Sequence, residues 1–140
     1  MKPLTLEWIE KAEADLLSAC REFRARKNPN YDAACFFAQQ CVEKYLKAAW
    51  VEAALIPPRT HDLGLLLKAL LDRYPHWADY REAMERLTSY AVEFRYPGER
   101  ATHAMAKIAT QQAIAILKQL RADLNGIPAQ CRLAEPPAVT

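Results

Sequence analysis

The sequence predicts an all-α fold, an up-and-down bundle of four or five helices. Apolar residues recur at spacings of three and four in five successive segments, the pattern of helices with one buried face. Strand-like alternation and internal repeats are absent from the sequence. Only three of the 140 residues are glycine while 51% are hydrophobic, which favours helices over a barrel or a sandwich. The connections between the segments are short, so consecutive helices are expected to pack antiparallel.

The first helix is expected from Leu4 to Lys27. Thr5 is its predicted N-cap, because a threonine hydroxyl can accept a hydrogen bond from a free N–H of the first turn. Arginine and lysine side chains crowd the last turns, where they suit the negative end of the helix dipole. An apolar stripe at helical spacing marks the buried face: Trp8, Ala12, Leu16, Ala19 and Phe23.

The second helix runs from Tyr31 to the prolines at 57 and 58, and the rest of the chain is organised around it. Its predicted buried face consists of Ala34, Ala38, Cys41, Val42, Tyr45 and Ala49. On the opposite face Glu43 and Lys47 are spaced for an i,i+4 ion pair. Two large apolar residues, Phe36 and Trp50, flank this polar strip. Their position favours a second, intermolecular surface on the helix. We therefore predict a dimer interface made of Phe36, Gln40, Glu43, Lys47 and Trp50.

A short polar loop follows the two prolines and opens the third helix. Thr60 or Asp62 is expected to cap that helix. Arg59 and His61 lie beside the same helix start, where free N–H groups favour an anion, so they form a candidate phosphate site. The alternative interpretation is a capped turn whose side chains are solvated.

Three further helices are predicted in the second half of the chain. They run from about His61 to Tyr74, from Trp77 to Phe94, and from Ala101 or Thr102 to Leu124, with breaks at prolines and glycines. The third helix is expected to bury Leu63, Leu66, Leu67, Leu70 and Leu71. The fourth is expected to bury Tyr80, Met84, Leu87, Ala91 and Phe94, and the last Met105, Ile108, Ala109, Ala113, Ile116, Leu120 and Leu124.

Size and composition indicate one domain over residues 1–125 and a loose, proline-containing tail over 126–140. The net charge of +2 is too small to indicate nucleic acid or a membrane surface. We expect a soluble, cytoplasmic protein, since no apolar run has the length of a membrane span and no signal-peptide pattern opens the chain. The four cysteines form no C-x-x-C pair and are interpreted as ordinary thiols rather than metal ligands: Cys20, Cys35, Cys41 and Cys131.

Several short motifs follow one another in a distinctive order. Residues 14–17 read ADLL, residues 31–40 read YDAACFFAQQ and continue as EKYLKA over 43–48, residues 58–63 read PRTHDL, and residues 95–97 read RYP. Together they resemble the HEPN family, the higher eukaryotes and prokaryotes nucleotide-binding domain. The resemblance extends over roughly residues 5–124.

The resemblance implies an all-α bundle that forms a homodimer. It also implies a prokaryotic partner, a minimal nucleotidyltransferase encoded beside it in a two-component or toxin–antitoxin system. Members of the family are proposed to bind nucleotides through polar residues of the bundle. In this chain Arg59 and His61 are then expected to contact phosphate, with Lys44 or Lys47 adding positive charge, and no cofactor beyond such a nucleotide is expected.

Ribonuclease members of the family resemble one another in an arginine, four to six intervening residues and a histidine near the start of the last helix. Here seven residues separate Arg95 from His103 and two separate Arg100 from His103, so neither pair meets that pattern. We therefore interpret the protein as a nucleotide-binding and interaction module rather than an enzyme. The alternatives are a metal-independent endoribonuclease toxin that uses Arg95 or Arg100 with His103, and an accessory subunit without a ligand.

Overall fold

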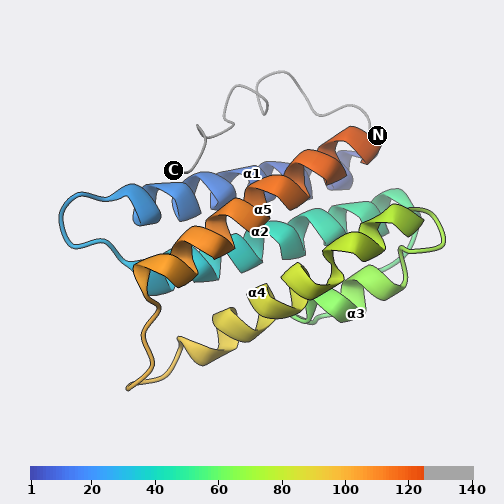
Figure 1. The fold of residues 1–140 in the computed structure, drawn as a ribbon. Coiled ribbons are helices and arrows are strands. Elements are labelled where there is room, and N and C mark those ends of the chain that lie inside the picture. The colour runs from blue at the N-terminus through green and yellow to red at the C-terminus, as the bar shows by residue number, and fades with distance from the viewer. Residues whose placement is uncertain (125–140) are drawn as a thin grey trace.

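The computed structural model describes residues 1–124, in which five α-helices and no strand occur. The four long helices are α1 (Pro3–Arg24), α2 (Tyr31–Glu52), α4 (Arg81–Glu93) and α5 (His103–Leu124), and they alternate in direction (Figure 1). The short α3 (Leu63–Lys68) and a 3₁₀ helix (Pro75–Tyr80) lie between α2 and α4. The predicted all-α bundle is confirmed. The predicted tail and Cys131 lie outside the described residues.

Helix α2 is the central element, since it contacts each of the other four helices. Helices α1 and α5 pack on one side of it, and α3 and α4 on the other (Figure 1). All six residues of its predicted inner face are buried. Several of them are alanines, and small side chains allow neighbouring helices to approach closely.

The prediction that Thr5 caps α1 is wrong. Because proline suits the first turn of a helix, α1 begins at Pro3, with Lys2 in the N-cap position. Thr5 therefore faces inward and is fully buried, and its hydroxyl donates to Glu52 Oε1 at 2.9 Å. This bond ties the start of α1 to the end of α2.

The inner face of α5 differs from the prediction at its first two positions. Met105 is half-buried and Ile108 is 42% exposed, whereas Ala106 and Thr110 are buried. The rest of the predicted stripe is buried as expected: Ala109, Ala113, Ile116, Leu120 and Leu124. The first turns of α5 thus pack through small residues. The prediction placed Met105 and Ile108 on the buried face because they are large and apolar, and this was the wrong face of the helix.

The third and fourth helices are shorter than predicted. After Lys68 the backbone continues in turns with i→i+3 hydrogen bonds, such as Leu70 N–H to Leu67 O at 2.9 Å. Pro75 then opens the 3₁₀ helix instead of only breaking the chain. Of the residues predicted to face inward, Leu71, Tyr80, Ala91 and Phe94 are only half-buried, while the other six are buried: Leu63, Leu66, Leu67, Leu70, Met84 and Leu87.

Two sets of interactions hold the C-terminal end of α5 in the bundle. Arg121 donates to both oxygens of the buried Glu13 on α1, each at 2.6 Å. Asp123 accepts from the indole N–H of the buried Trp77 at 2.6 Å and lies 2.5 Å from His76 Nε2. Since these partners lie on two different segments, they fix α5 against α1 and the 3₁₀ helix.

The described cysteines are core residues, as the sequence predicted. Cys20, Cys35 and Cys41 are buried and free. Burial raises the pKa of the Cys35 thiol to about 12, and the Asp32 carboxylate adds to the rise. Burial likewise raises the pKa of Cys41 well above its ordinary value. In residues 1–124 no helix is long and apolar enough to cross a membrane.

Candidate functional site

A buried carboxylate on α2 organises the polar side chains of this helix. The Glu43 side chain is only 5% exposed. Its Oε1 lies 2.7 Å from His61 Nδ1 and accepts from Gln39 Nε2 at 3.2 Å, and its Oε2 accepts from Lys47 Nζ at 3.0 Å. The predicted i,i+4 pair of Glu43 and Lys47 is therefore confirmed, and His61, Gln39 and, at 3.4 Å, Gln40 Nε2 are further donors to Glu43.

These donors keep Glu43 ionised. Burial alone would raise its pKa, but hydrogen bonds from His61, Lys47 and Gln39 outweigh burial and hold the pKa below the ordinary glutamate value. An ionised carboxylate can only accept hydrogen bonds. It follows that His61 donates from Nδ1, which leaves Nε2 as the ring nitrogen available to a ligand.

The loop that carries His61 is fixed to its neighbours. Gln39 Nε2 donates to His61 O at 2.8 Å, and Thr88 Oγ1 on α4 accepts from Leu63 N at 3.1 Å. Asp62 caps α3 by accepting from Leu65 N at 3.3 Å, as one of the two predicted caps. These bonds place the His61 side chain, which is 65% exposed, at the surface between α2 and α4.

A small recess opens beside His61. It is lined from α2 by Phe36, Gln39 and Gln40, and from α4 and its end by Thr88, Ala91, Val92 and Arg95. Its volume is about 40 Å³. Small-molecule pockets usually measure about 300–1,000 Å³, so the recess alone accommodates one polar group and not a whole nucleotide. Arg95 and His61, which are far apart in sequence, thus line one concave surface.

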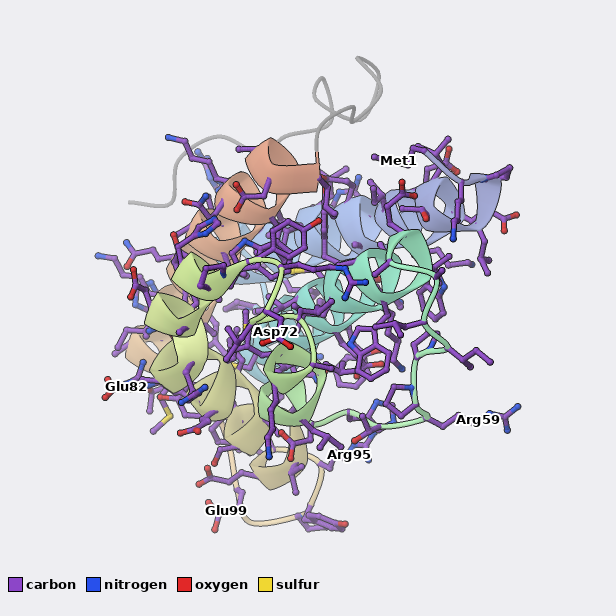
Figure 2. The ribbon with its side chains drawn as sticks, turned by 90° about the vertical axis from the view of Figure 1, so that its right-hand side faces the viewer. Met1, Arg59, Asp72, Glu82, Arg95 and Glu99 are labelled. Carbon is purple, nitrogen blue, oxygen red and sulfur yellow. The ribbon has the colours of Figure 1, made fainter. Side chains whose placement is uncertain are left out.

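The predicted phosphate-binding residues do not all gather at this recess. Arg59 is exposed, and Figure 2 shows it at the outer edge of its loop with its side chain directed away from the helices. Lys44 pairs with Asp15 on α1 at 2.5 Å. Lys47 is occupied by Glu43 and lies 5.7 Å from the centre of the Trp8 ring. Of the four predicted residues, only His61 lines the recess.

The family model of the HEPN domain matches residues 5–122. The chain belongs to the HEPN domain family. Comparisons with curated proteins and with solved structures gave no match. The family assignment agrees with the resemblance seen in the sequence motifs.

The face of α2 that was predicted to be open is largely covered in this HEPN bundle. Glu43 and Lys47 are buried, at 3% and 8% exposure. The Trp50 indole N–H donates to Leu66 O at 2.9 Å, and its ring packs against the core. The expectation of an open strip is wrong for Glu43 and Lys47, because residues 57–68 fold back along α2. Trp50, Phe36 and Gln40 are half-buried, and their contact with a second copy stays a prediction.

The candidate catalytic residues are divided between two places. The His103 ring lies 5.0 Å from the ring of Phe23 and 5.5 Å from that of Tyr31, at the start of α5. Arg100 lines a hollow beside residues 28–32, whereas Arg95 lines the recess with His61. The histidine that shares a recess with Arg95 is thus His61.

The sequence interpretation missed one residue of the site and one pairing of residues. Gln39 binds both Glu43 and the backbone of His61, and its position four residues before Glu43 was a usable signal. The pairing of His61 with Arg95 had no signal in the local sequence, because it depends on how α4 packs against α2.

Proposed function

We propose that this HEPN protein is a nucleotide-binding and interaction module whose phosphate contacts are His61 and Arg95. The observation that supports the proposal most directly is the shared recess. The Glu43 carboxylate binds Nδ1 of the exposed His61 imidazole and so fixes the orientation of the ring. The other ring nitrogen, Nε2, is then already oriented for a ligand. Arginine binds phosphate oxygens well because its planar guanidinium offers parallel N–H donors.

The module acts as a homodimer that pairs with a minimal nucleotidyltransferase in a two-component or toxin–antitoxin system. Membership of the HEPN family supports this part of the proposal. Gln40 and Trp50, both half-buried, are the proposed dimer contacts on α2. Light scattering of Trp50→Glu tests them, since a charge in an apolar contact should convert a dimer to a monomer, and an unchanged mass would remove this face from the dimer.

Calorimetric titration of the full chain with AMP and ATP tests the nucleotide contacts. We expect His61→Ala and Arg95→Ala to weaken binding about tenfold or more each, the size of a lost charge-assisted hydrogen bond. Arg59→Ala is the matched control, because it removes the same charge from an exposed position outside the recess. Equal weakening by Arg59→Ala and Arg95→Ala would mean that only overall charge matters, and the recess would then have no role.

A further inference from the structure

A second hollow adjoins the recess, and its lining includes four aromatic rings. Phe36, Phe37, Tyr90 and Phe94 line it together with Asn30, Asp32, Ala33, Ala91 and Arg95, and its volume is about 350 Å³. Phe36, Ala91 and Arg95 line both the hollow and the recess, so the two are neighbours on one surface. The larger hollow has the size of a small-molecule site, which usually starts at about 300 Å³.

The rings of this hollow are arranged as a partly open cluster. Phe36 meets Phe37 edge to face with 5.6 Å between ring centres, and Tyr90 lies 5.5 Å from Phe94. Phe37, Tyr90 and Phe94 pack against the core, and all four rings are half-buried. Aromatic faces that remain accessible can stack on a planar ligand.

Polar groups border the aromatic rings of the hollow. Arg95 lies at the junction with the recess, where His61 and Gln40 follow. Asp32 also lines the hollow, and its Oδ1 already accepts from Ala101 N at 2.6 Å. The surface therefore passes from an apolar, ring-lined part to a part with a guanidinium and an imidazole. A nucleoside phosphate has a matching arrangement, since a planar, partly apolar base lies at one end of the molecule and an anionic phosphate at the other.

We propose that the aromatic hollow binds the base of a nucleoside phosphate whose phosphate group lies between Arg95 and His61. The inference rests on the function proposed above and adds the base-binding residues, with Phe36 as the principal stacking ring. Stacking on aromatic rings tolerates every base because each base has a π-face. The site is therefore expected to discriminate weakly among bases and strongly against ligands without one.

The experiment compares AMP with ribose 5-phosphate, which carries a hydroxyl group at C1 in place of the base. Dissociation constants are measured on the full chain by calorimetry, or by NMR titration where binding is weak. Phe36→Ala should weaken AMP binding about tenfold, the usual size of a lost base stack, and leave ribose 5-phosphate within about twofold of the wild type by the same reasoning. Phe36→Tyr should restore AMP binding, because it keeps the ring.

Tyr96→Ala is the matched control. This aromatic residue directly follows Arg95, is 64% exposed and lines neither hollow. Its removal should leave both ligands unchanged. Far-UV circular dichroism and a thermal melt of each variant establish that the bundle is intact before binding is interpreted.

Each remaining outcome has a definite meaning. If ribose 5-phosphate binds as tightly as AMP and His61→Ala weakens both, the phosphate contact stands and the base site is overturned. If Phe36→Ala lowers the mass to a monomer but leaves AMP binding unchanged, a second copy occupies the hollow and the base site is again overturned. If the wild type binds neither ligand, the proposed function fails together with this inference. Phe36-dependent binding of an RNA trinucleotide tighter than that of AMP would support the site and identify RNA as the source of the nucleotide.

Discussion

Replacement of Glu43 by methionine tests the central role of the buried carboxylate. Methionine has a linear side chain of similar length but no charge, so the change removes the acceptor with little change in volume. Lys47, whose side chain is 10% exposed, then loses its ion-pair partner inside the bundle. Removing one partner of a buried pair costs about 3–5 kcal/mol. The nearby Trp8 ring offsets about 1 kcal/mol of this through a cation–π contact.

The expected net loss of unfolding free energy is therefore roughly 2–4 kcal/mol. For a chain of this size the corresponding fall in Tm is roughly 6–12 °C. Urea denaturation followed by circular dichroism measures the free energy, and a thermal melt measures Tm. A change below about 0.5 kcal/mol, the usual range of a surface substitution, would refute the reasoning.

Two companion variants separate the charge effect from packing. Lys47→Met should cost less than Glu43→Met, because Glu43 keeps His61 and Gln39 as donors. The double variant Glu43→Met with Lys47→Met should recover most of the stability, since replacing both members of a buried pair by apolar residues is often neutral. A double variant as unstable as Glu43→Met alone would mean that the loss comes from packing and not from an unpaired Lys47.

Two more measurements probe the ionised groups. The pKa of Glu43 is lower in the folded chain than in the unfolded one. The ionised Glu43 therefore contributes its full stabilisation above a pH of about 4.3, the ordinary glutamate pKa, and this stabilisation is lost as the pH falls through the lower folded pKa. In urea titrations at several pH values, the free energy of unfolding should fall less at acid pH in Glu43→Met than in the wild type. Asp123→Asn should destabilise by about 1–2 kcal/mol and shift the Trp77 fluorescence, because it weakens the acceptor of the indole N–H, whereas Glu99→Gln on the exposed loop should change neither.

Local periodicity was sufficient to predict the helices and most of the core. All six residues predicted for the inner face of α2 are buried, because the 3.6-residue period marks the stripe that faces the core. Since other helices surround α2, it also buries apolar residues outside that stripe, namely Cys35, Leu46, Ala48 and Val51. The same reasoning failed at Ile108, where apolar size suggested burial. Helix α5 instead approaches the bundle through Ala106 and Ala109, and close approach favours the smaller residues.

The candidate site was less accessible to prediction from the sequence. A helical wheel gives the direction in which Glu43 and Lys47 point but not what covers them. Their burial depends on the chain beyond the two prolines folding back along α2, with Trp50 bonded to Leu66 O. The proximity of His61 and Arg95 depends in addition on the packing of α4. The burial of Glu43 and Lys47 and the proximity of His61 to Arg95 are consequences of tertiary structure. The local sequence around each residue therefore carries little information about them.

The polar cluster on α2 is better explained by the position of His61 than by stability. A buried ion pair contributes little net stability compared with apolar residues of the same size, because desolvation offsets the attraction between the charges. The double variant of Glu43 and Lys47 separates the two roles. It should fold nearly as well as the wild type, yet it leaves His61 Nδ1 without its carboxylate and the ring without a fixed tautomer. Nucleotide binding should therefore fall in this variant although stability does not, and full binding by a stable double variant would show that the carboxylate has no part in presenting His61.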